Sequence, residues 1–278
     1  MKQPTIDLPM IKRAADSIKG TACVTPLKKS IKLSKLLNKN IYLKLETMQH
    51  TGSFKLRGAA NIILNLNEHR NEASVVTASS GNHGRAVAYV ANELKIPAVI
   101  CMTELVPKYK IDGIKELGAE IVIFGDNQDL ATEKALEIAK QRKMSFISAF
   151  DDPYVIAGQG TIGLEILVER PEIDTIVVQL SGGGLASGIA IAAKAIKPSV
   201  KIIGVTLQYG AAMYESIKAG EIIIAMEHAL KQEKLVLEGG GAACIAMLLH
   251  YKNIHFGANV AVICSGDNID VDKLLDLL

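Results

Sequence analysis

Short apolar runs alternate with longer amphipathic runs along this 278-residue chain, and this alternation constrains its fold more than any other feature. The apolar runs have the length of buried strands, and the amphipathic runs have the period of helices. Strands and helices in alternation predict a parallel sheet with helices on its faces. One predicted strand begins just after residue 73, and the other predicted strands cover 40–46, 97–102, 119–125, 175–180, 201–207 and 259–265. The predicted helices include 7–19, 59–67, 108–118, 129–142 and 161–169.

The alternation pauses near residues 150–160 and then resumes. We therefore expect an α/β protein with two open, twisted parallel-sheet lobes that carry helices on both faces. The predicted small domain covers residues 50–150 and is inserted into a large domain made of 1–49 and 151–278. Ligands of open α/β sheets bind beyond the carboxyl ends of the strands, so the turns after strands are candidate sites.

Composition excludes several classes of function. The net charge is +2, and no basic cluster is interleaved with aromatic residues, which argues against nucleic acid as a partner. No stretch approaches the roughly 20 apolar residues that span a bilayer, and the first residues lack a signal-peptide core. The four cysteines are far apart, as is typical of buried thiols in a reducing compartment. We expect a cytoplasmic protein without a membrane partner.

The turn "SGGGLASG" at residues 181–188 follows a predicted strand and opens a helix. Gly182, Gly183 and Gly184 lack Cβ atoms, so backbone N–H groups can approach an anion where the helix dipole favours negative charge. The turn is not a Walker loop, and no acid follows at the spacing of a dinucleotide site. It fits a phosphate monoester, although a tight turn without a ligand has the same composition.

Two further turns have a suitable position. "SSGNHG" at residues 79–84 offers hydroxyl, amide and N–H groups to a small polar ligand, although a helix cap by Ser79 or Ser80 would also explain it. His83 could be a base, but a packed or solvated histidine is the commoner case. "ICSGDNID" at residues 263–270 follows the last predicted strand, and it could be a simple turn.

The stretch "TMQHTGSFKLRG" places Lys55 among small residues. A lysine in a loop is usually a solvated charge. Together with a phosphate cradle and a turn for a carboxylate, however, it supplies what a pyridoxal phosphate enzyme needs. The lysine forms a Schiff base with the aldehyde, and the cofactor is an electron sink for a carbanion at Cα of an amino acid.

Several segments, in their order along the chain, resemble the motifs of one known enzyme family. "TGSFKLRGA" resembles its Schiff-base motif S-F-K-x-R-G-A, "ASSGNHGRAVAYVA" its substrate loop, and "FDDPYVIAGQGTIGLEIL" the segment that returns to the large domain. "SGGGLASGIA" resembles its tetraglycine phosphate loop with Ser181 in place of the first glycine, and "LEGGGAA" and "CSGDN" resemble E-x-x-G-A and S-G-G-N. Nearly the whole chain thus resembles the fold-type II (tryptophan synthase β-like) pyridoxal phosphate enzymes, in the serine/threonine dehydratase and serine racemase branch.

The resemblance implies pyridoxal 5′-phosphate in the cleft between the lobes, with Lys55 as the Schiff-base lysine that also removes the Cα proton. It implies a threonine/serine ammonia-lyase that converts a β-hydroxy amino acid to a 2-oxo acid and ammonia, and it implies a homodimer. The implied cofactor-binding residues are Phe54, Lys55, Asn82, Gly182, Gly183, Gly184, Leu185 and Ser265. The implied substrate-binding residues are Ser79, Ser80, Gly81, Asn82 and His83.

Ser80 leaves a second activity open. It matches the position where racemase-like members carry a serine as acid/base on the face opposite the lysine, whereas many dehydratases have alanine there. A site with two bases can return a proton from the other side, so serine/threonine racemase is an alternative. Ser80 could also only bind the carboxylate or cap a helix. "GAAMYESIKAG" at residues 210–220 faintly resembles lyases of hydroxyectoine-derived compounds, which is a further alternative.

The sequence departs from the family at two places. Thr206 and Ala212 stand where acids of the divalent-cation site would be, so we expect no metal. Residues 217–224 run straight into "AMEHALKQEKLVLEGGG", where family members usually have a longer segment that borders the site. A deletion there could damage catalysis, so a homologue that binds the cofactor without turnover is another alternative. β- or γ-replacement is disfavoured by "SFKLRGA" and "SSGNHG".

Overall fold

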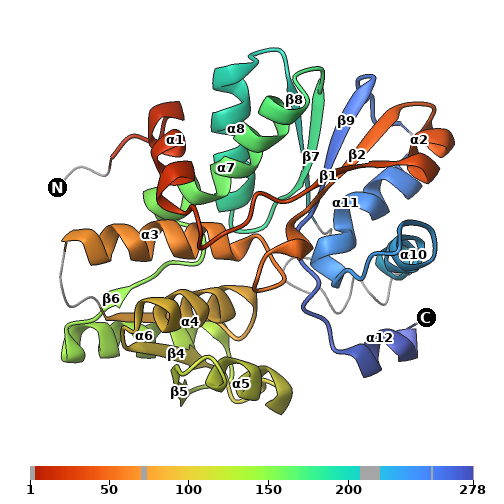
Figure 1. Ribbon diagram of the computed structural model, residues 1–278. Helices are drawn as coiled ribbons and strands as arrows, with labels where there is room; N and C mark the ends of the chain where they lie inside the picture. The colour runs from red at the N-terminus through yellow and green to blue at the C-terminus, as the bar shows by residue number, and fades with distance from the viewer. Residues whose placement is uncertain (1–3, 70–73, 207–219, 252, 278) are drawn as a thin grey trace.

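The computed structural model describes residues 4–69, 74–206, 220–251 and 253–277, and its strands form two sheets (Figure 1). The first has the order β1-β2-β9-β7-β8 and consists of Leu27–Ser30, Asn40–Leu45, Asn259–Cys264, Thr175–Gln179 and Lys201–Val205. The second has the order β5-β4-β3-β6 and consists of Glu120–Ile123, Ala98–Met102, Val75–Ala78 and Ser145–Phe146. All neighbouring strands are parallel except β1, which is antiparallel to β2. The predicted fold class is confirmed.

Helices cover both faces of each sheet. Those of the first part of the chain are α1 Leu8–Ser17, α2 Ile31–Leu37, α3 Lys55–His69, α4 Asn82–Leu94, α5 Lys108–Lys115 and α6 Gln128–Arg142, with the short η1 Glu46–Met48. Those of the second part are α7 Pro153–Glu169, α8 Gly184–Ile196, α10 Glu221–His228, α11 Gly239–His250 and α12 Val271–Leu277, with the short η2 Ala229–Glu233.

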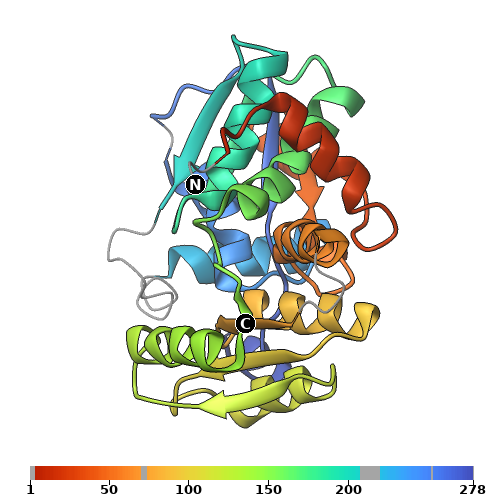
Figure 2. The same cartoon turned by 90° about the vertical axis from the view of Figure 1, so that its left-hand side faces the viewer.

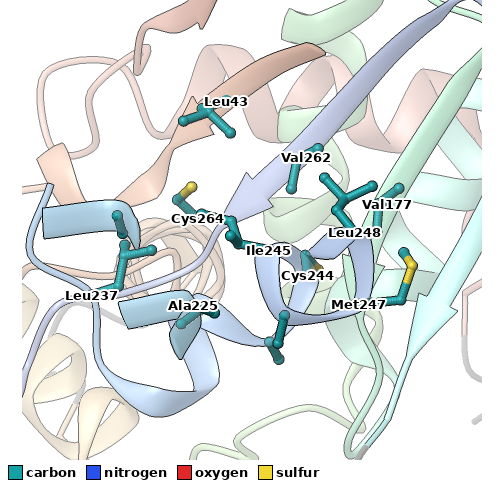
Figure 3. Packing of buried hydrophobic residues seen from close by; sticks show 14 of the residues in the cluster. Leu43, Val177, Ala225, Leu237, Cys244, Ile245, Met247, Leu248, Val262 and Cys264 are labelled. Atoms are coloured by element: carbon teal, nitrogen blue, oxygen red, sulfur yellow. The ribbon is translucent and has the colours of Figure 1, made fainter. Parts of the chain in front are cut away.

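The first sheet is buried on both faces, so alternate side chains of one strand enter two different cores. Leu43, Val177 and Val262 point into a core that α10 and α11 cover, as Figure 3 shows. Their neighbours Tyr42 and Ile176 point the other way and pack with residues of α7 and α8. Burial on both faces explains why these strands are continuous apolar runs in the sequence.

The second sheet also has two cores. Val75 and Ile100 face the side covered by α3 and α4, whereas Val76 and Cys101 face α6. Helix α3 lies between the two sheets in both views and packs against α4 and α7 (Figures 1 and 2). The second sheet lies within residues 75–146, inside the predicted small domain, but the domain boundaries themselves stay a prediction.

Several elements differ from the sequence-based expectation. Helix α7 begins at Pro153, ahead of the predicted start at 161, because Asp152 caps it by accepting hydrogen bonds from Tyr154 and Val155 N–H at 2.8 and 3.2 Å. Helix α3 begins at Lys55 instead of 59. Strand β1 was not predicted, since Leu-Lys-Lys-Ser has no apolar run. Among the described residues, no helix is long and apolar enough to cross a membrane.

Candidate active site

The segment that carries Lys55 lies against the turn after β9. The N–H of Phe54 donates to the carbonyl oxygen of Ser265 at 3.1 Å, and Ser53 forms an antiparallel bridge with Gly266. Two segments that are far apart in the sequence therefore meet at the carboxyl end of β9. This edge is where open α/β sheets bind their ligands.

Lys55 is the first residue of α3, and its side chain is partly buried. Its Nζ donates a hydrogen bond to the carbonyl oxygen of Ala149 at 2.7 Å and lies 5.2 Å from the centre of the Phe54 ring. Burial lowers the pKa of Lys55 to about 8, although the charge of Glu238 acts in the opposite direction. About a tenth of the amine is therefore uncharged at pH 7, and this form can attack a carbonyl group.

Asn82 begins α4 and joins two other segments of the site. Its Nδ2 donates to Oε1 of Glu238 at 2.6 Å, and its Oδ1 accepts from Nδ2 of Asn268 at 2.6 Å. Asn268 also donates to the carbonyl oxygen of Thr51 at 2.8 Å. Burial raises the pKa of Glu238, which caps α11. These hydrogen bonds hold α4, which covers the second sheet, against α11 and against the turn after β9.

The glycine turn predicted to hold a phosphate lies between β7 and α8. Gly183 caps α8 with φ of +90°, a left-handed conformation that favours glycine. Gly183 has no side chain to cap α8, so among the described residues the first N–H groups of the helix are open to an anion. A Cβ on Gly182 would collide with the ring of Phe150, and one on Gly184 would lie 2.6 Å from its carbonyl oxygen. Residues 149 and 150 therefore connect Lys55 to this turn.

The other predicted residues divide between the site and the core. Ser265 is buried directly after β9, and Leu185 is buried with its side chain in the core, so that only its backbone is free for a ligand. Ser79 Oγ accepts a hydrogen bond from Gly81 N–H at 3.3 Å. The roles that the resemblance implies for these residues stay predictions, and His83 needs a separate account.

His83 is buried, and it is not among the residues that line the cavity beside the N-terminus of α4. Its Nε2 lies 3.2 Å from the carbonyl oxygen of Ile147, to which it donates as the neutral tautomer. Burial, assisted by the charge of Lys55, lowers the pKa of His83 to about 3, so it is uncharged at neutral pH. The geometry argues against direct substrate binding by His83, and its ring instead fixes α4 to the strand end at Ile147.

A cavity of about 310 Å³ opens beside the N-terminus of α4. It is lined by Ser80, Gly81, Asn82, Arg85, Tyr109, Lys110, Ile114, Glu238, Asn268 and Ile269. Among the described residues, Arg85 and Lys110 form no ion pair, so their positive charges attract an anionic group into the cavity. Lys55 and the glycine turn do not line this cavity.

Sequence reasoning gave no role to several residues that the structure brings to the site. Glu238 belongs to the segment "LEGGGAA", but nothing in that segment alone places its carboxyl group beside Asn82. Asn268 belongs to "ICSGDNID", but that segment does not predict its hydrogen bond to Asn82. No sequence signal pointed to Ala149, because its carbonyl oxygen holds Lys55 through tertiary structure alone.

The residues at the site fit pyridoxal phosphate. Lys55 offers a partly buried amine whose hydrogen bond goes to a backbone carbonyl and not to an acid. The uncapped N-terminus of α8 suits a phosphate. Ser53 Oγ, next to Gly266, is a buried hydroxyl without a hydrogen-bond partner among the described residues. An aldehyde-reactive amine, an anion cradle and a free hydroxyl together fit this cofactor.

Comparison with known proteins agrees with this geometry. Residues 18–224 match the family model described as "Pyridoxal-phosphate dependent enzyme". The chain belongs to this family. An L-threonine ammonia-lyase from Thermotoga maritima is 37% identical over 310 aligned residues, which cover 97% of this chain and 77% of the relative.

Two solved structures of this family have a similar fold. The maize serine racemase has a TM-score of 0.90 and 29% identity, with 98% of this chain and 97% of the racemase covered. The processed threonine deaminase isoform 2 of Solanum lycopersicum has a TM-score of 0.84 and 32% identity, with 99% and 94% covered. Dehydratase-named and racemase-named members are thus both similar to this chain.

The positions at which the sequence departs from the family motifs are only partly within the described residues. Thr206 directly follows β8, whereas Ala212 and most of residues 210–220 lie outside the described residues. Among the described residues, no three metal-binding side chains are close enough to hold an ion. The 310-residue alignment is longer than the 278-residue chain, so the Thermotoga relative has residues without a counterpart here. The family match ends at residue 224, next to the predicted short segment.

Proposed function

We propose that this pyridoxal phosphate enzyme is an ammonia-lyase of the threonine/serine type, which converts a β-hydroxy amino acid to a 2-oxo acid and ammonia. The observation that carries the proposal is the Lys55 amine, whose pKa of about 8 leaves it reactive beside an anion cradle. The names of the Thermotoga and tomato proteins support the substrate class.

Different residues of the chain would bind the cofactor's phosphate and orient its ring. When bound, the cofactor withdraws electrons from Cα of the amino acid and so makes its proton acidic. The N–H groups of residues 182–185, which lead into α8, would hold the phosphate, and Phe54, Asn82 and Ser265 would orient the ring. A hydroxyl group at Ser265, unlike a carboxylate, leaves a ring nitrogen largely unprotonated, which suits elimination.

Substrate binding and proton transfer are assigned to neighbouring segments. The turn at residues 79–82 would bind the α-carboxylate, and the free charges of Arg85 and Lys110 favour its entry. Lys55 Nζ would take the Cα proton, because an amine with a pKa of about 8 is an effective base near neutral pH. Loss of the β-hydroxyl as water then gives an enamine, which hydrolyses to the 2-oxo acid and ammonia.

Racemisation is the second candidate function. The observation that favours it is that Ser80 lines the cavity, next to Asn82, and a hydroxyl there can act as a second proton carrier. The likeness to maize serine racemase supports the same reading. A lyase for a hydroxyectoine-derived β-hydroxy amino acid is a narrower form of the first proposal, and an inactive homologue is the outcome if the shortened segment removes an essential contact.

The test is an incubation of the purified protein and pyridoxal phosphate with L-threonine, L-serine and their D-enantiomers. Keto acid and the ratio of enantiomers are followed together, with Lys55→Ala as the control. We expect keto acid from an L-substrate and none from the variant. A protein that binds the cofactor but releases no keto acid from any of the four would contradict the lyase proposal.

We also propose that the protein is a homodimer. Ile31 and Leu36 on α2 expose 76% and 62% of their surface, and Val24, which precedes β1 in the chain, exposes 77%. Large apolar side chains on a surface are often covered by a partner. Light scattering coupled to size exclusion would give twice the 29.8 kDa chain mass, whereas a monomer at micromolar concentration would contradict the proposal.

A further inference from the structure

Arg57 lies two residues after Lys55 in the first turn of α3, and it is 1% exposed. Its Nε and Nη2 donate to the two carboxylate oxygens of Glu46 at 2.7 and 2.9 Å. Its Nη1 and Nη2 also donate to the two oxygens of Glu165. Nη1 donates to the hydroxyl of Thr161 at 2.9 Å as well. The guanidinium is therefore held by two carboxylates in two forked arrangements.

A second cation completes this buried cluster. Nζ of Lys44 donates to Oε2 of Glu165 and to the carbonyl oxygen of Thr25, at 2.5 and 2.6 Å. Lys44 and Glu46 are 0% exposed. Two cations and two carboxylates make the cluster electrically neutral, which is the arrangement that buried charges require. We call Lys44, Glu46, Arg57 and Glu165 the buried ion cluster.

The buried ion cluster joins three elements to the turn that carries Lys55. Lys44 belongs to β2 and Glu46 to η1, directly after β2, whereas Glu165 belongs to α7. The backbones of α3 and α7 are also in close contact, because a Cβ on Gly158 would lie 2.5 Å from the carbonyl oxygen of Arg57. The first turn of α3 is thus fixed on the large sheet and on α7.

We propose that Arg57 is a positioning residue for Lys55, which holds the first turn of α3, and with it the buried amine, in place. The inference rests on the proposed role of Lys55 as the amine that reacts with the cofactor. A change of Arg57 would therefore alter both where the amine lies and the pH at which it is free.

Burial of the amine sets the expected direction. It is the largest cause of the low pKa of Lys55, whereas the charge of Glu238, at the start of α11, raises that pKa. His83 of α4 is uncharged at neutral pH, and the charge of Lys110 acts on Glu238 from the α5 side. When the first turn of α3 is no longer held, the amine becomes more solvated, and its pKa rises towards the ordinary value of 10.5.

The experiment measures the reaction of Lys55 with pyridoxal between pH 6 and pH 10. The full chain is freed of cofactor, and the absorbance change on covalent binding is recorded, with Lys55→Met as the blank for all other lysines. The midpoint of the pH dependence reports the pKa of the Lys55 amine. We expect the midpoint to rise by about half a unit to one unit in Arg57→Gln and by a smaller amount in Glu165→Gln, because both variants loosen the turn that buries the amine. Arg57→Lys, which keeps the charge but not the forks, should restore only part of the midpoint.

The matched controls are Arg142→Gln and Glu120→Gln, which break an exposed ion pair of the same kind. They should leave the midpoint unchanged. If Arg57→Gln does not fold, Glu165→Gln still tests the inference, because its carboxylate is partly solvent-accessible and its loss is better tolerated. Midpoints that equal the wild-type value in folded variants, with only a lower melting temperature, would overturn the inference. No reaction of the wild-type protein beyond the Lys55→Met blank would instead overturn the proposed role of Lys55.

Discussion

The side-chain amide of Asn82 donates a hydrogen bond to the carboxyl group of Glu238, with 2.6 Å between Nδ2 and Oε1. Asn82 opens α4 beside the second sheet, and Glu238 caps α11 beside the first sheet. Gly266 allows this approach, because a Cβ there would lie 2.5 Å from the same Oε1. The carboxyl group of Glu238 therefore affects two parts of the site. It lines the cavity, and its charge raises the pKa of Lys55.

Glu238→Gln should lower the pH at which Lys55 becomes reactive. Glutamine can keep the oxygen that accepts from Asn82, but it removes the negative charge that raises the pKa of Lys55. The midpoint of the reaction with pyridoxal should therefore fall below about 8. Glu172→Gln, which loses an exposed carboxylate, is the matched control and should not change the midpoint. An unchanged midpoint in Glu238→Gln would show that Glu238 is already protonated at that pH.

Lys55→Met should make the cofactor-free protein more stable at pH 7. The folded pKa of Lys55 is about 8 and its ordinary value is 10.5, so the folded state binds the proton less well than the unfolded state. The resulting cost is fully present below pH 8 and disappears as the pH rises towards 10.5. We expect a gain in the free energy of unfolding of about 1 to 2 kcal/mol at pH 7. Urea unfolding at pH 7 and pH 9 should show a smaller gain at the higher pH, and a larger one there would contradict the assigned pKa.

Gly184→Ala should weaken cofactor binding. The new Cβ would lie 2.6 Å from the carbonyl oxygen of Phe150, and backbone cannot move away as a side chain could. We expect about tenfold weaker binding of pyridoxal phosphate and a loss of about 1 to 3 kcal/mol in stability. Gly113→Ala is the control, because its Cβ would meet only Arg85 Nη1, at 3.8 Å. Absorbance titration and urea unfolding measure the two effects, and equal affinities for both variants would contradict the assigned phosphate turn.

The strands that could be predicted from the sequence are those whose burial leaves a continuous apolar run. Thr175–Gln179 and Asn259–Cys264 are such strands, since the cores on both faces require apolar side chains. Strand β1 could not be predicted in this way, because it is an edge strand with two exposed lysines. The early start of α7 has a local signal in Asp152 and Pro153, an N-cap followed by a proline.

The candidate site was predictable where it is built from contiguous residues. Lys55 and the glycine turn are each contained in one short segment, so their chemistry is visible locally. The hydrogen bond between Asn82 and Glu238 joins residues 156 positions apart, and that from Lys55 to Ala149 spans 94. Only the packing of α4, α11 and α3 brings these groups together. The pKa of Lys55 depends on such long-range neighbours, so it cannot be predicted from a sequence motif.

Ser80→Ala should separate elimination from racemisation. If Ser80 is the proton carrier opposite Lys55, the variant keeps the base that removes the proton of the L-substrate and loses the group that acts on the other face. Keto acid formation from L-serine should then stay within about threefold of wild type, and the interconversion of D- and L-serine should fall by about 10²-fold or more. The measurement follows keto acid, enantiomer ratio and the exchange of the Cα proton in D₂O.

Ser79→Ala is the comparison within the same turn. Ser79 Oγ accepts from Gly81 N–H at 3.3 Å, so its loss disturbs the turn that would bind the carboxylate. It should therefore lower elimination and racemisation by the same factor, mainly through KM. A Ser80→Ala variant that behaves in this way too would show that Ser80 only binds the carboxylate. The site would then have Lys55 as its sole base, and elimination without racemisation would be its expected chemistry.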